Sequence, residues 1–180
     1  PGLQNDLAQA GAPRLDWMND VRWFGFAQWG PRFTSSLVTQ FSTRSLLEYT
    51  IRKRSAVFPQ IQFIVKSDVT NLLADETCGR ISGVMLHHRD DRSSQTLNAD
   101  LIVDASGRES KTPQCLEALG YNCPAETWVN SFLGYSSRIY RRPKNFAEHA
   151  DWKGILIRST PPMSSRAGGI FPIEGDRWMA

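Results

Sequence analysis

The chain has 180 residues, of which 41% are hydrophobic and 22% are charged, a composition typical of soluble globular proteins. Its net charge is only +3, from 21 basic and 18 acidic residues. Because the basic residues are scattered, we expect no nucleic-acid partner, which would need a basic stripe on one face. No apolar run approaches the roughly 18 residues of a membrane span, and no signal-peptide pattern is present. We therefore expect no integral membrane segment and a cytoplasmic location.

The first part of the chain combines a short helix with extended stretches. Residues 3–10 have the composition of a short helix. Residues 21–29 and 33–41 are rich in aromatic and β-branched side chains, and the Gly30-Pro31 pair between them is typical of a turn. We therefore predict a hairpin around Gly30-Pro31 that belongs to an antiparallel sheet.

A longer helix is predicted after residue 44. Ser45 and Glu48 have the spacing of a capping box, in which the two side chains satisfy backbone N–H groups of the first turn. The basic run at residues 52–54 lies where it opposes the negative end of the helix dipole. Pro59 ends the helix.

Several short strands are predicted next. Residues 61–65 and 68–73 are β-rich runs, and residues 81–88 are predicted to pair with residues 94–98 across a polar turn. Residues 101–105 are aliphatic and predict a buried strand. The order of these elements indicates a mixed α/β arrangement with a β excursion.

The last third contains a helix and further strands. We predict a helix over residues 112–119 and a long sheet strand over residues 129–140, where side chains alternate between two faces. Residues 155–158, 169–173 and 176–180 predict further strands. The last of these stops part-way and the chain opens without Met, so we expect an internal segment of a longer protein.

Cysteine and histidine spacing predicts no metal site. Cys78, Cys115 and Cys123 are odd in number and lack Cys-x-x-Cys spacing, so neither a disulfide framework nor a zinc site is indicated. The three histidines have no spacing to Cys or acidic residues that names a metal.

The sequence Asp104-Ala105-Ser106-Gly107-Arg108 directly follows the aliphatic run. Small residues at the end of a buried strand leave room for a cofactor to approach the backbone. A plain turn at the end of an ordinary strand is the alternative.

Several segments in order resemble one family. Residues 43–54, 68–73 and 99–108 resemble the middle of FAD-dependent monooxygenases and related oxidoreductases of the para-hydroxybenzoate hydroxylase fold. Three further segments are similar to a bacterial subgroup of FAD-dependent oxidoreductases: residues 110–121, 134–138 and 171–175. The resemblance implies an α/β chain of the α+β type, with part of a Rossmann-like FAD-binding domain and an antiparallel-sheet substrate domain.

The resemblance also divides the chain. Residues 1–42 would be a connecting helix and hairpin of the substrate-domain sheet, residues 43–122 part of the FAD-binding domain, and residues 123–180 a further part of the substrate domain. No Gly-x-Gly-x-x-Gly sequence, which cradles the diphosphate in this fold, is present in these residues. We therefore expect the isolated segment to bind FAD poorly and to be inactive by itself.

The resemblance implies a set of FAD-binding residues. Arg44 would reach the pyrophosphate and ribityl region, where a guanidinium fork suits phosphate oxygens; a solvated first-turn residue is the alternative. Val69 would lie beside the adenine through its backbone, or be a core valine. Asp104, with Ala105, Ser106 and Gly107, would lie close to the diphosphate and ribose hydroxyls.

The implied function is that of an FAD-dependent oxidoreductase, a monooxygenase or epoxidase that oxygenates an apolar or aromatic small molecule, with NAD(P)H as a possible electron donor. Aromatic hydroxylases have Asp-Gly where this chain has Asp-Ala-Ser-Gly, as in isoprenoid reductases and halogenases of the superfamily. A flavin-dependent reductase or dehydrogenase of isoprenoid-like substrates is therefore one alternative, and a non-catalytic domain derived from a flavoprotein is another. Trp23, Tyr135 and Arg138 are candidate substrate contacts, against core or surface roles. The pattern assigns no catalytic residue and no oligomeric state.

Overall fold

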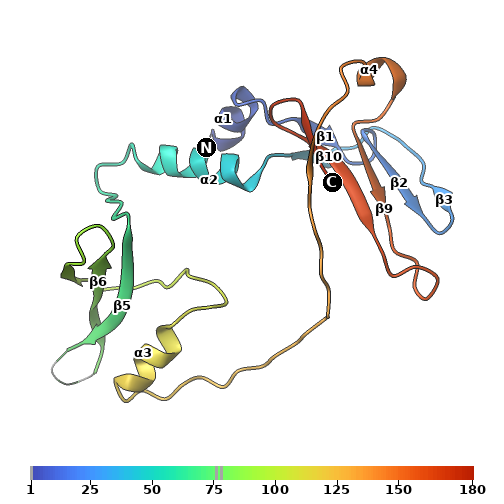
Figure 1. The fold of residues 1–180 in the computed structure, drawn as a ribbon. Coiled ribbons are helices and arrows are strands. Elements are labelled where there is room, and N and C mark those ends of the chain that lie inside the picture. The colour runs from blue at the N-terminus through green and yellow to red at the C-terminus, as the bar shows by residue number, and fades with distance from the viewer. Residues whose placement is uncertain (1, 76, 78) are drawn as a thin grey trace. The chain divides into compact units, whose positions relative to one another are not determined.

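A computed structural model of the protein describes residues 2–75, 77 and 79–180. It shows a mixed α/β chain in which most of the regular structure is β-sheet (Figure 1). Within the described residues, no helix has both the length and the apolar character needed to cross a membrane.

The chain forms two compact units. The first contains Pro1–Ile61 and Gly134–Ala180, and the second contains Gln62–Leu133. The predicted domain ranges, 1–42, 43–122 and 123–180, were drawn on the family resemblance and stay a prediction.

The first unit is built on a six-stranded sheet in the order β3-β2-β9-β10-β11-β8. Neighbouring strands are antiparallel except for β2 and β9, which are parallel. The strands are β2 (Val21–Gly25), β3 (Gln28–Trp29), β8 (Ile139–Arg141), β9 (Gly154–Ile157), β10 (Gly168–Ile173) and β11 (Arg177–Met179), with the short helix α4 (Phe146–His149) between β8 and β9.

A second small sheet and two helices complete this unit. Strand β1 (Arg14–Asp16) pairs with β4 (Val38–Gln40), and the helices are α1 (Leu3–Gln9) and α2 (Arg44–Ser55). Leu15 of β1 and Val21 of β2 are fully buried, and Leu7, Ile173 and Trp178 join them in the core. The helix predicted over residues 3–10 and the strands predicted over residues 155–158, 169–173 and 176–180 are confirmed.

The predicted hairpin is wrong in its turn and in its partner. Strand β2 reverses at Phe26 and Ala27 and pairs with β3, so the turn precedes Gly30-Pro31. Both turn residues have positive φ, 53° and 61°, as a two-residue turn between right-twisted strands requires. The stretch at residues 33–41 supplies β4, which pairs with β1 instead.

The second unit is built on a three-stranded antiparallel sheet in the order β5-β6-β7. Its strands are β5 (Ser67–Ala74), β6 (Ile81–His88) and β7 (Ser94–Asn98), and the helix α3 (Thr112–Ala118) contacts β5. Val84 and Leu86 of β6 are buried. The predicted pairing of residues 81–88 with residues 94–98 and the predicted helix near residue 112 are confirmed.

Two predicted strands are absent and a third is mostly absent. Residues 61–65 and 101–105 are irregular, and Leu101 and Val103 are 80% and 77% exposed. A strand needs hydrogen-bonding neighbours, and neither segment belongs to a sheet in the described part of the chain. In the predicted strand at residues 129–140, only the end adopts strand conformation, as part of β8. Arg138 exchanges backbone hydrogen bonds with Ala180 (2.8 and 2.9 Å), and the preceding residues have no partner strand in the described part of the chain.

Candidate functional site

Arg44 is the first residue of helix α2. The N-cap is Thr43, whose hydroxyl oxygen accepts a hydrogen bond from the Leu46 N–H at 3.2 Å, so the predicted cap at Ser45 is wrong by two positions. The Arg44 side chain is 89% exposed, and its Nε donates to Glu48 Oε1 at 2.5 Å. Arg44 is therefore a solvent-facing guanidinium at a helix N-terminus, paired along its own helix.

The second unit brings most of the other predicted cofactor residues together. A pocket of about 490 Å³ lies between β5, β6, the segment at residues 102–106 and the start of α3. Val69, Asp104, Ala105 and Ser106 line this pocket. Gly107 does not line it, and has a positive φ of 86° in the turn that follows. The remaining lining residues are Ser67, Asp68, Leu72, Val84, Ile102, Val103, Glu109, Lys111, Thr112 and Cys115.

Asp104 organises the wall of this pocket. One carboxylate oxygen accepts from the Ser106 N–H (2.8 Å) and hydroxyl (2.5 Å), and the other from the hydroxyls of Ser110 and Thr112. The Ser106, Ser110 and Thr112 hydroxyls hold the pKa of the Asp104 carboxyl well below its usual range. An ionised carboxylate has about four lone-pair positions, and Asp104 accepts four hydrogen bonds. All four come from residues 106–112, so the carboxylate holds this loop against the start of helix α3.

The charges around the pocket are mostly acidic. Asp68 forms an ion pair with Arg89, and the hydrogen bond from Arg89 lowers the pKa of the Asp68 carboxyl. Glu109 and Lys111 also line the pocket, so Lys111 is the cation among its lining residues. The apolar part of the wall includes the buried Val84. The arrangement suits an uncharged ligand with hydrogen-bonding groups better than a phosphate, because phosphate would meet several carboxylates.

The predicted substrate residues lie in the first unit. Trp23 donates from Nε1 to the Trp17 backbone oxygen at 3.0 Å. Trp17 is the centre of a half-buried ring cluster, with ring centroids 5.4 Å from Trp23 and 5.5 Å from each of Phe41 and Phe171. Sequence reasoning missed the contacts of Phe41 and Phe171, because Phe41 follows β4 and Phe171 lies in β10, two segments that no local pattern connects.

Tyr135 and Arg138 do not belong to this ring cluster. Tyr135 is exposed in irregular chain, and the Arg138 guanidinium lies over the Tyr140 ring at 5.4 Å.

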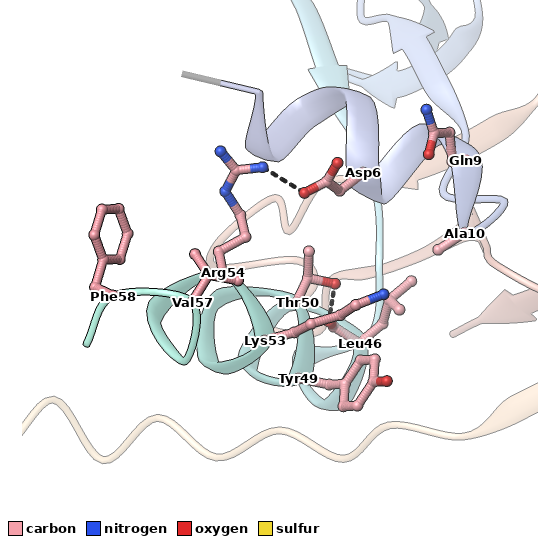
Figure 2. Close-up of a pocket in the computed structure, with 10 residues that line it drawn as sticks. All are labelled: Asp6, Gln9, Ala10, Leu46, Tyr49, Thr50, Lys53, Arg54, Val57 and Phe58. Atoms are coloured by element: carbon pink, nitrogen blue, oxygen red, sulfur yellow. Dashed lines mark hydrogen bonds and ion pairs between the residues drawn. The ribbon is translucent and has the colours of Figure 1, made fainter. Parts of the chain in front are cut away.

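A second pocket was also missed. It has a volume of about 540 Å³ and lies between helices α1 and α2, where Asp6 and Arg54 form an ion pair across the two helices (Figure 2). Its walls are Tyr49, Val57 and Phe58 on one side and Gln9 on the other. None of the predicted site residues lines it.

Metal ligands do not gather in the described part of the chain, where no group of three His, Cys, Asp or Glu residues could hold an ion. Cys115 and Cys123 are free thiols, and Cys78 lies outside the described residues.

Comparison with known proteins finds a distant relative. No family model matches the chain. Protein Rv3254 of Mycobacterium tuberculosis (strain ATCC 25618 / H37Rv) is 31% identical over 187 residues, an alignment that covers 99% of this chain and 38% of that protein. The chain therefore spans well under half the length of this relative, whose name states no activity.

Proposed function

We propose that this chain is part of an FAD-dependent oxidoreductase, most simply a monooxygenase or epoxidase acting on an apolar or aromatic small molecule. The observation that carries the proposal is the pocket of the second unit. Val69 and the sequence Asp104-Ala105-Ser106, which the resemblance implies as cofactor residues, line one cavity. Because they come from separate segments of the chain, their meeting does not follow from sequence proximity.

The pocket suits the adenosine half of FAD. Its apolar wall offers a surface for the adenine ring, and its polar backbone and side chains offer partners for amine and hydroxyl groups. The side chains of Ala105 and Ser106 are small, so a ligand can approach the backbone there. Asp104 would act by shaping this wall, since its oxygens are occupied by the loop. This replaces the direct contact with ribose hydroxyls that the resemblance implies.

Arg44, which belongs to the first unit, is a separate candidate for the pyrophosphate that the resemblance implies. A guanidinium offers several donors in a plane and suits phosphate oxygens, and the N-terminus of the 12-residue helix α2 adds a favourable dipole. Flavin supplies the redox chemistry when bound, and the protein supplies binding and orientation. The half-buried rings around Trp17 and Trp23 form an apolar surface of the kind that lines pockets for aromatic ligands.

The Asp-Ala-Ser-Gly sequence at residues 104–107 is compatible with a second flavin-dependent activity. This variant, which resembles that of isoprenoid reductases and halogenases, permits a flavin-dependent reductase or dehydrogenase as the alternative activity. Oxygen uptake with NAD(P)H indicates the monooxygenase, whereas substrate-dependent reduction of the flavin without oxygen indicates the reductase.

The test is FAD binding by the full-length protein. We expect flavin absorbance in the purified protein or on titrating its apo form with FAD. Ala105→Phe, which puts a ring into the pocket, should weaken FAD binding at least tenfold. Ala125→Phe, at an exposed position of the same unit outside the pocket lining, is the matched control. A colourless protein that gains no flavin absorbance on adding FAD would refute the proposal.

A further inference from the structure

The pocket between helices α1 and α2 has no part in the proposed function. Both helices belong to the first unit, so the pocket is contained in one compact body. Its volume of about 540 Å³ falls in the range of small-molecule sites, which is about 300–1,000 Å³. The pocket is therefore large enough for a small organic ligand.

The apolar surface of this pocket comes from side chains that remain largely exposed. Tyr49, Val57 and Phe58 are 63%, 74% and 56% exposed, although all three line the pocket. The segment after α2 is held by turn hydrogen bonds, from the Phe58 N–H to the Ser55 oxygen at 3.2 Å and from the Ile61 N–H to the Phe58 oxygen at 3.0 Å. An apolar ligand that covers these side chains releases water from them, which favours binding.

Some polar groups of the pocket already have partners. Arg54 of α2 forms an ion pair with Asp6 of α1, and this pair joins the two helices (Figure 2). The hydroxyl of the buried Thr50 donates to the Leu46 backbone oxygen at 2.7 Å. These groups hold the walls of the pocket together and need no partner from a ligand.

The Lys53 ammonium and the Gln9 amide remain for a ligand. Within the part of the chain that the structure describes, Lys53 forms no ion pair and the Gln9 side chain forms no hydrogen bond. In Figure 2, the Lys53 side chain extends toward the Ala10 end of α1, away from Phe58. Lysine and glutamine side chains both offer N–H donors. The pocket thus combines unused donors with an apolar surface.

The charge around Lys53 favours an anion. Residues 52–54 are all basic, and Asp6 is the acidic residue among those that line the pocket. The end of a helix contributes only about half a negative charge, which is less than these cations supply. Because Arg54 already pairs with Asp6, the charge of Lys53 matches a ligand with a single negative charge.

We propose that this pocket binds a small carboxylate with an aromatic or aliphatic body. The carboxylate accepts hydrogen bonds from Lys53 and Gln9, and the body covers Tyr49 and Phe58. This site lies in a different unit from the pocket that contains Asp104. The proposal therefore does not depend on FAD binding.

The test is calorimetric titration of the full-length protein with 4-phenylbutyrate and with 4-phenylbutan-1-ol. The two probes share one apolar body and differ in charge. We expect saturable binding of the carboxylate, about fivefold tighter than that of the alcohol, as a partly exposed ion pair provides at its upper range. Added salt should reduce this preference, because it screens the charge of Lys53.

Two variants assign the binding to this pocket. Lys53→Met keeps the apolar stem and should remove the preference for the carboxylate, with a loss of about fivefold for that probe alone. Tyr49→Ala should weaken both probes by about fivefold, since it removes an aromatic contact. Both side chains are exposed, so we expect the variants to keep the wild-type melting temperature.

Arg52→Met is the matched control. It removes a cation from the same turn of α2 at a position outside the pocket lining. Because exposed charges at a distance are screened, the affinity for the carboxylate should change by less than about twofold.

Four results would overturn the proposal. Equal affinity for the two probes would show that Lys53 does not recognise an anion. Binding that both Lys53→Met and Tyr49→Ala leave unchanged would occur elsewhere on the protein. An equal loss of carboxylate affinity in Arg52→Met and Lys53→Met would show attraction to the basic run instead of a site. Absence of saturable carboxylate binding would show that the pocket does not take this class of ligand.

Discussion

Thr43→Val should destabilise the first unit by about 2–3 kcal/mol. Valine keeps the shape of the side chain but removes its hydroxyl, which caps the Leu46 N–H and donates to Glu174. Loss of an N-cap costs about 0.5–2 kcal/mol, and loss of a hydrogen bond to a charged acceptor about 1.5–3 kcal/mol. The two losses share one hydroxyl and do not add fully. In the Val variant the Thr43 N–H still donates to Glu174, so the expected loss of unfolding free energy is smaller than the sum of the two values.

Urea unfolding followed by Trp fluorescence is the appropriate assay, because five of the six tryptophans lie in the first unit. Thr43→Ser keeps the hydroxyl and should cost less than about 1 kcal/mol, since Ser caps helices as well as Thr does. If the Val and Ser variants have the same unfolding free energy within about 0.5 kcal/mol, a difference at the resolution of such comparisons, the hydroxyl does not stabilise the helix start and the reasoning is refuted.

Four further predictions test other parts of the structure. Gly83→Ala should destabilise the second unit by about 1–3 kcal/mol, because its Cβ would lie 2.6 Å from the Leu97 backbone oxygen. Gly168→Ala is the control, since no atom lies within 4 Å of its Cβ position. Equal urea midpoints for the two variants would contradict this prediction. Burial alone would raise the pKa of Glu174, but its hydrogen bonds from the N-cap lower it overall; its stabilisation is thus complete above the unfolded pKa of about 4.3 and is lost as pH falls through the lower folded value. Wild-type unfolding free energy should therefore fall more steeply with acid below about pH 4 than that of Glu174→Gln, and parallel curves would contradict it. Asp104→Asn, which leaves one oxygen to accept, should speed hydrogen exchange across residues 104–112, and unchanged exchange would show that the carboxylate does not organise this loop. Glu48→Gln should strengthen FAD binding by roughly twofold, since an i,i+4 ion pair of this kind is weak, and a loss of affinity would assign Glu48 to the site.

Local patterns predicted the elements that depend on neighbours in sequence. The pairing of β6 with β7 follows from two β-rich runs and a polar turn, and helix α3 follows from its own composition. The pocket residues Val69 and Asp104 were found from the order of segments that resemble a family, and the structure places both on one cavity.

Contacts between distant segments could not be predicted in this way. The parallel pairing of β2 with β9 joins residues near positions 22 and 155, and the hydrogen bonds from Thr43 to Glu174 span 131 residues without a local signal. The aliphatic run at residues 101–105 predicted a buried strand because hydrophobic composition does not show whether a pairing strand is present. The hydrogen bonds that occupy the Asp104 carboxylate likewise come from hydroxyls up to eight residues away. The directions of these hydroxyls are defined only in the folded loop.

We propose that the pocket containing Val69 and Asp104 recognises the adenosine half of FAD. The decisive experiment is isothermal titration of the full-length apoprotein with FAD and with FMN, which lacks that half. We predict that FAD binds at least a hundredfold more tightly than FMN, and that Ala105→Phe removes most of this difference. Equal affinity for the two flavins, or binding of neither, would contradict the assignment of this pocket.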